Sequence, residues 1–207
     1  MSKRKKIFVA TATGILILVI VASTLFILLK PKEIHDLKLD TVYIADDYIP
    51  GKHSSVYYVE LKSDGTYILM YDKTRGYEED YGYEAGFLPY IEYRKGTYEK
   101  KGTDYILHAT EGGGVGFIDL EAVKKKQIFE KGTMTQEEVE EDHSYNPRAL
   151  WKTEDNKYRL GYLLEDGSYA EDTDIKDYLY TSDRKDIPDS LQEFFKEYKL
   201  VEEETTI

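Results

Sequence analysis

Tyrosine and acidic side chains are interleaved in one stretch of this 207-residue chain. Three consecutive acids are flanked by tyrosines, and three more tyrosines follow downstream. Aromatic rings stack on sugars, and carboxylates pair with cations, so this combination can recognise a glycan or a basic peptide. A solvated surface loop is the alternative. The candidate ligand-binding residues are Tyr77, Glu78, Glu79, Asp80, Tyr81, Tyr83, Tyr90 and Tyr93.

Signatures of common catalytic and metal sites do not occur in the sequence. His35, His53, His108 and His143 are too far apart for a zinc-binding HxH or HExxH motif, and the chain has no cysteine. No serine lies in a GxSxG context. The run EGGGVG at 111–116 lacks the lysine that completes a phosphate-binding loop, so we expect a flexible bend there. We predict no catalytic residue, metal site or cofactor, and a non-enzymatic protein.

An acidic cluster follows the third predicted hairpin. Glu171, Asp172, Asp174 and Asp177 could supply oxygen ligands to calcium, but the ligand order and glycine of an EF-hand are missing. A solvated turn is favoured, and calcium binding by 171–177 stays open. Paired carboxylates for glycoside hydrolysis lie ~5–9 Å apart in space, which spacing along the chain does not test. An envelope glycan hydrolase is therefore an alternative function.

A long apolar segment precedes all these residues. Ile7–Leu29 is uncharged and, at ~1.5 Å rise per residue, can cross a hydrocarbon core of ~30 Å as a helix. The basic residues before it place the amino terminus in the cytoplasm and the remainder outside. A cleaved signal peptide is the alternative. The predicted organisation is a cytoplasmic tail (1–6), a transmembrane helix (7–29), a linker (30–39), an extracytoplasmic β-rich domain (40–200) and a tail (201–207).

The charge distribution narrows the class of partner. Removing the four positive charges of residues 3–6 from the formal net charge of −12 leaves −16 for the rest of the chain. A domain this acidic repels phosphate backbones, so nucleic-acid binding is excluded. The expected partner is cell-wall glycan or an envelope protein. The expected location is the cell membrane of a Gram-positive bacterium. A structural or regulatory partner of another membrane protein is a further alternative, with Ala10, Thr11, Thr13 and Gly14 at a helix contact.

Composition and turn signals predict a mainly β domain. All 20 tyrosines follow the apolar segment, and tyrosine favours half-buried sheet faces. An Asp-Gly turn joins two strands within 56–71, and related sequences recur at 96–107 and 163–169. We expect an antiparallel meander or barrel. An amphipathic carboxyl-terminal helix is indicated by apolar residues at helical spacing, namely Leu191, Phe194, Phe195 and Tyr198.

The pairing of the first hairpin is not determined by its sequence. A two-residue turn places Leu61 opposite Ile68, whereas a three-residue turn with a bulge at Gly65 places Leu61 opposite Tyr67. Both faces of the second strand are largely apolar, so both alternatives remain.

The hairpin pattern resembles that of small lipocalin-like β-barrels of bacterial envelope proteins. It consists of Leu61-x-x-Asp-Gly-Thr-Tyr67, then Gly-Thr-Tyr at 96–98 and Tyr-Ile-Leu at 105–107, with an echo at 158–180. The resemblance implies a barrel with a ligand cavity and carries over no functional residue. Together these observations favour a membrane-anchored extracytoplasmic binding or interaction module.

Overall fold

The computed structural model describes Val19, Val21 and residues 34–47, 55–76, 81, 87–135, 137–139, 147–171 and 178–201. The predicted transmembrane segment Ile7–Leu29 otherwise lies outside these residues, and it stays a prediction. Within the described part of the chain, no helix is long and apolar enough to span a membrane. The chain divides into two compact units, 1–32 and 33–207, and the second contains the fold described below.

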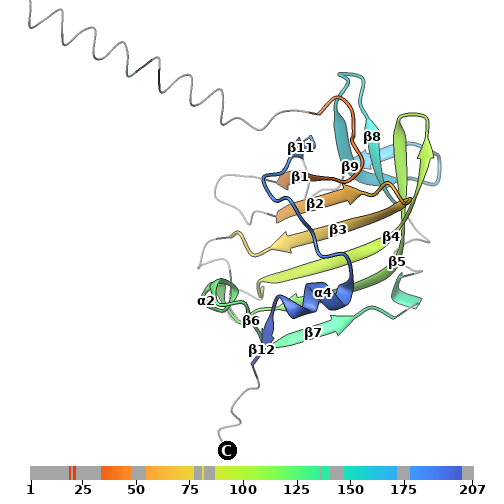
Figure 1. The fold of residues 1–207 in the computed structure, drawn as a ribbon. Helices are drawn as coiled ribbons and strands as arrows, with labels where there is room; N and C mark the ends of the chain where they lie inside the picture. The colour runs from red at the N-terminus through yellow and green to blue at the C-terminus, as the bar shows by residue number, and fades with distance from the viewer. Residues whose placement is uncertain are drawn as a thin grey trace, which may run out of the picture. The chain divides into compact units, whose positions relative to one another are not determined.

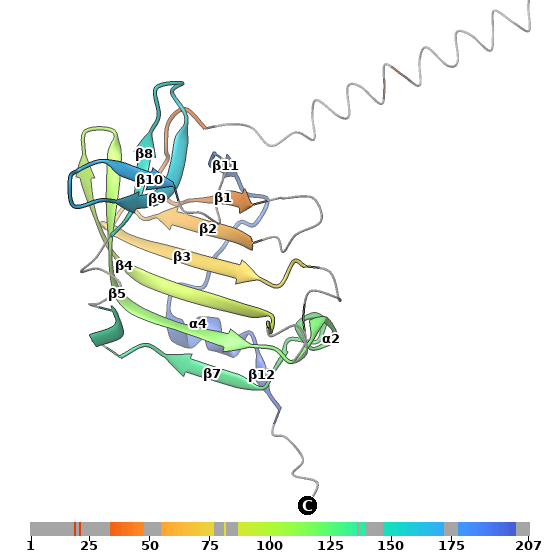
Figure 2. The same ribbon diagram turned by 180° about the vertical axis from the view of Figure 1, so that it is seen from behind.

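The second unit is mainly β, built on one curled antiparallel sheet that forms a half-barrel (Figures 1 and 2). The strand order is β10-β9-β8-β5-β4-β3-β2-β1-β11, with β7 on β5 and a separate parallel pair β6-β12. Most neighbours are consecutive in the chain, so the predicted meander is confirmed. The elements are β1 Thr41–Asp47, β2 Ser55–Leu61, β3 Thr66–Lys73, β4 Tyr90–Lys101, β5 Asp104–Gly116, α2 Leu120–Lys124, β6 Gln127–Ile128, β7 Glu130–Thr133, β8 Arg148–Lys152, β9 Tyr158–Leu163, β10 Tyr169–Glu171, β11 Tyr180–Thr181, α4 Leu191–Lys196 and β12 Lys199–Leu200.

The β2–β3 hairpin adopts the bulged alternative. Leu61 pairs with Tyr67, and Gly65 takes a φ of 86°, which favours glycine. The Asp64 carboxylate accepts hydrogen bonds from the backbone N–H and the hydroxyl of Thr66, at 2.9 and 2.6 Å. The same arrangement recurs at Asp166, which accepts from Ser168 at 2.9 and 2.6 Å. The repeated Asp-Gly motif therefore builds the same turn twice.

The sheet has a hydrophobic core on each face, which we call the inner and the outer core. Inside the curl, Val59, Leu69 and Leu150 belong to the inner core. The outer core contains Met70 and Phe194 and is covered by α4 (Figure 1). Strand β2 is buried along its whole length, so both of its faces are packed, and both are largely apolar. This double burial explains why alternation alone could not decide the hairpin pairing.

The predicted carboxyl-terminal helix is confirmed as the short helix α4. Ser190 caps its amino end, with the hydroxyl accepting from the Glu193 N–H at 3.2 Å. Leu191 and Phe194 are buried against the outer core, while Phe195 and Tyr198 pack against it partly exposed. The helix therefore covers a flank of the sheet, as its apolar spacing predicts.

The β4–β5 hairpin joins strands β1–β3 on one side of the sheet to strands β8–β10 on the other. Strands β4 and β5 pair along their full length, but their alignment shifts between Lys95 and Gly96, so that Thr110 is an extra, bulged residue. The backbones approach so closely there that a Cβ on Gly96 would lie 1.9 Å from the His108 carbonyl oxygen. Beyond the bulge, β5 leaves the β7 side and pairs with β8.

The bend expected at residues 111–116 needs correction. The segment EGGGVG at 111–116 is the end of strand β5 and not a bend. Its glycines are packed, since a Cβ on Gly112 would lie 2.6 Å from the Met134 sulfur and one on Gly113 would lie 2.9 Å from Leu191. Ile34, which falls within the predicted linker 30–39, belongs to the inner core.

We predict that Gly96→Ala strongly destabilises the domain. The added methyl group would collide with a backbone carbonyl that cannot move without breaking the β4–β5 ladder. We expect a loss of about 3 kcal/mol or more in the free energy of unfolding, measured by urea denaturation.

Gly132→Ala is the matched control, because no heavy atom lies within 4 Å of a Cβ built on Gly132. Its stability should stay within about 0.5 kcal/mol of the parent. Equal stability losses in the two variants would show that the approach at Gly96 does not constrain the fold.

Candidate functional site

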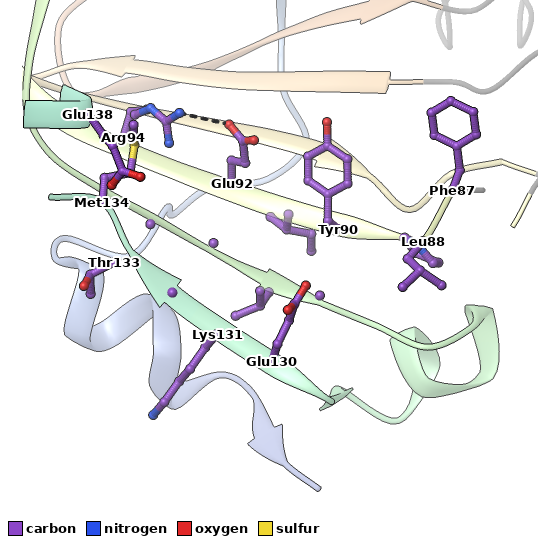
Figure 3. A pocket seen from close by; sticks show the side chains of 17 residues that line it. Phe87, Leu88, Tyr90, Glu92, Arg94, Glu130, Lys131, Thr133, Met134 and Glu138 are labelled. Carbon is purple, nitrogen blue, oxygen red and sulfur yellow. Dashed lines mark ion pairs between the residues drawn. The ribbon is translucent and has the colours of Figure 1, made fainter. Parts of the chain in front are cut away.

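A groove of about 780 Å³ runs along the inner face of the sheet where β4, β5 and β7 lie side by side (Figure 3). One end lies at Phe87, which is more than half exposed, and the other at Met134 and Glu138. The volume is within the range of small-molecule sites, roughly 300–1,000 Å³. The residues around it are Phe87, Leu88, Pro89, Tyr90, Ile91, Glu92, Arg94, Gly113, Gly114, Val115, Gly116, Glu130, Lys131, Gly132, Thr133, Met134 and Glu138.

The floor of the groove is largely glycine backbone. Gly114 on β5 pairs with Gly132 on β7, so two neighbouring positions carry no side chain. A Cβ on Gly132 would have open space around it. The groove therefore exists because side chains are missing where a β-sheet face normally carries them, and it exposes peptide groups to a ligand.

Strand β4 supplies one wall through its alternation. Tyr90, Glu92 and Arg94 are every second residue and share the inner face, as Figure 3 shows. The Arg94 guanidinium forms an ion pair with the Glu92 carboxylate at 3.2 Å. The Arg94 side chain is 17% exposed and that of Glu92 is 38% exposed, so the carboxylate is the more accessible partner.

The groove is acidic on its open side. Glu92, Glu130 and Glu138 contribute carboxylates there against one guanidinium. Lys131 points to the other face of β7, where its amine lies 5.6 Å from the Phe195 ring (Figure 3). The groove side therefore carries two excess negative charges, which favour a cationic ligand.

Glu138 is held in place by a capping box. Its carboxylate accepts from the Thr135 N–H at 2.7 Å, and the Glu138 N–H donates to the Thr135 hydroxyl at 3.2 Å. The Thr135 N–H lowers the pKa of Glu138, so this side chain stays ionised. Thr135 and Glu138 thus form the reciprocal pair of hydrogen bonds that defines this motif.

Stacked rings and cations continue the wall beyond the groove. The rings of Tyr57 and Tyr71 stack at 4.2 Å, and Arg148 lies 5.0 Å above Tyr57. The Lys73 amine lies 5.2 Å from the Tyr71 ring and 5.4 Å from the Tyr90 ring. Burial raises the pKa of Tyr90, so its hydroxyl remains protonated and can donate a hydrogen bond. These contacts fix Tyr90 at the groove before any ligand binds.

The structure separates the candidate residues identified from the sequence. Tyr90 lies in the groove, whereas Tyr93 is buried in the outer core, stacked on Phe194 at 5.4 Å. The Tyr81 hydroxyl donates to the Lys73 carbonyl at 2.9 Å, next to the end of β3. The other predicted ligand-binding residues, Tyr77, Glu78, Glu79, Asp80 and Tyr83, lie outside the described residues, as do Asp172, Asp174 and Asp177 of the acidic cluster.

Sequence reasoning did not identify most of the groove. The alternation of Tyr90, Glu92 and Arg94 is a signal that could have placed these three side chains on one strand face. No comparable signal connects them with Glu130 or Gly132, because β7 reaches β4 only through pairing with β5. Among the residues that the structure describes, no three histidine, cysteine or acidic side chains are grouped to hold a metal ion.

Comparisons with known proteins assign this chain to no group. No protein-family model, curated protein or solved structure matches it.

We predict that Glu92→Gln destabilises the domain by about 1–2 kcal/mol in urea denaturation, because a mostly buried guanidinium loses the charge of a carboxylate 3.2 Å away. Glu99→Gln is the matched control. Glu99 forms an exposed ion pair with Lys101 at 3.4 Å on the same strand, so its loss should cost less than about 0.5 kcal/mol. A larger cost for Glu99→Gln than for Glu92→Gln would contradict this account of the wall.

Proposed function

We propose that this protein is a binding module held at the bacterial cell membrane by Ile7–Leu29, with its carboxyl-terminal domain outside the cell. The observation that carries the proposal is the groove of about 780 Å³ on the inner face, floored by glycine backbone. Its ligand is a component of the cell envelope. No step of the proposal requires a cofactor.

The construction of the groove supports recognition of a ligand. Its β4 wall stands on a strand that pairs with β3 and β5, and its floor lies on β5, which pairs with β4 and β7, so the groups on these two strands are fixed before binding. Fixed groups lose little conformational entropy on binding. Tyr90 offers a ring and a hydroxyl, Glu92 an accessible carboxylate, and the floor offers peptide groups. This combination of an apolar surface with a few oriented polar groups is typical of binding sites.

The amino-terminal segment supports the proposed location. Ile7–Leu29 is long and uncharged, and four basic residues precede it. On the positive-inside rule the second unit faces the exterior. Residues 1–32 contain six of the basic residues and no acid, so this unit has a net charge of −18, which keeps it soluble at a membrane surface and away from anionic lipid.

We expect residues 33–207 to show localised chemical-shift changes when titrated with envelope material. Both cores lie within this unit, so it should fold without the apolar segment. Wall glycan fragments are titrated first and cell-envelope extract second, with amide resonances followed by NMR. Changes should gather at the glycines of β5 and at Tyr90–Arg94. A well-dispersed spectrum that responds to neither material would contradict the proposal.

A groove-filling variant tests the location of the site. In Gly132→Leu the new side chain enters open space above the floor, so stability should be kept and the shift changes should be lost. Thr97→Leu adds the same side chain at an exposed position of β4 that does not line the groove, and it should bind as the parent does. If both variants bind normally, the ligand lies elsewhere.

A further inference from the structure

We propose that β7 is a docking edge at which an extended basic peptide segment of another protein joins the sheet as an additional strand beside the groove. This inference rests on the proposed function, because it names the chemical class that the groove receives.

Strand β7 lies at a border of the sheet (Figures 1 and 2). In the described part of the chain it pairs with β5 alone, and all four of its residues are exposed. An exposed edge strand presents a row of backbone donors and acceptors that another chain can pair with.

The direction of these backbone groups follows from the ladder. The Met134 N–H donates to the Gly112 carbonyl at 2.8 Å, which makes this a hydrogen-bonded pair. Such pairs alternate along an antiparallel ladder, so Gly132 is also bonded to Gly114. Lys131 and Thr133 lie between these pairs, and their N–H and C=O groups therefore point away from β5, to the open edge.

Charge determines which peptide fits this edge. A strand added beside β7 would lie ~4.8 Å away and would carry every second side chain over the groove. Those side chains would lie beside Glu130, and the Glu92 carboxylate on β4 adds to the negative potential of the groove, whereas the positive charge of Lys131 is directed to the other face. Basic residues in alternation are the complement. A second copy of this chain fits poorly, because it carries a net charge of −12 and would place Glu130 near its counterpart.

The absence of a side chain on Gly132 completes the site. Long basic side chains need space above β7 to extend towards the carboxylates on β4, and Gly132 leaves that space open. The glycine pair that forms the floor of the groove also gives the added strand access to it.

The probe is an eight-residue capped peptide in which lysine alternates with valine, labelled with a fluorophore and titrated with the detergent-solubilised full-length chain. Fluorescence anisotropy measures binding at low salt. We expect the lysine peptide to bind at least 10-fold more tightly than its glutamate–valine counterpart. A lysine–valine peptide with every backbone amide N-methylated keeps the charge but cannot donate to the edge, and it should bind at least 10-fold more weakly.

Thr133→Pro removes one outward N–H without removing a bond to β5, so it should weaken the lysine peptide at least 10-fold at unchanged melting temperature. Thr133→Val keeps the N–H and should bind within about twofold of the parent.

Lysine-peptide binding that survives Thr133→Pro but is lost in Gly132→Leu would overturn strand addition while the groove remains the site. Glycan binding without lysine-peptide binding would overturn the inference alone. Dimers that dissociate in Thr133→Pro would assign the edge to a second copy and also overturn it.

Discussion

A close approach of two backbones at Gly96 is the constraint on which the rest of the domain depends. Because a Cβ there would lie 1.9 Å from the His108 carbonyl, only glycine lets β4 and β5 stay paired through the bulge at Thr110. Past that point β5 changes partner from β7 to β8. The change of partner curls the sheet, and the curl encloses the inner core and leaves the groove at its open side.

Glycine serves a second purpose on the same hairpin. A glycine within a strand loses cross-strand contacts and costs conformational entropy, so a run of three glycines lowers the intrinsic stability of β5. Here the neighbouring side chains of Met134 and Leu191 occupy the positions that a Cβ would take at Gly112 and Gly113. Among the groove glycines, space remains open only at Gly132, the β7 partner of Gly114. Packing thus stabilises most of the run, and the groove is the part left unfilled.

The groove and the edge of β7 form one continuous surface with one electrostatic character. Carboxylates from β4, β7 and the capping box at Thr135 face the groove, while Lys131 is directed across the sheet towards Phe195. Further along the inner face, the Arg148 guanidinium lies over the Tyr57 ring, which stacks on Tyr71. A ligand that approaches this surface therefore meets oriented acceptors, and an extended basic segment matches both the charge and the backbone groups.

Local chemistry by itself determined the turns, the caps and the apolar segment. Asp64 and Asp166 each bond within their own turn, Thr135 and Glu138 cap one another, and the spacing of Leu191 and Phe194 is that of a helix face. The tertiary structure decided the hairpin pairing, the strand conformation of residues 111–116, and the burial of Tyr93 opposite the face that carries Tyr90. The physical reason is that β2 and β3 are largely apolar on both faces. In addition, a run of glycines shows no alternation of apolar and polar side chains. Which face a side chain occupies, and where a groove opens, therefore depended on partners distant in the chain.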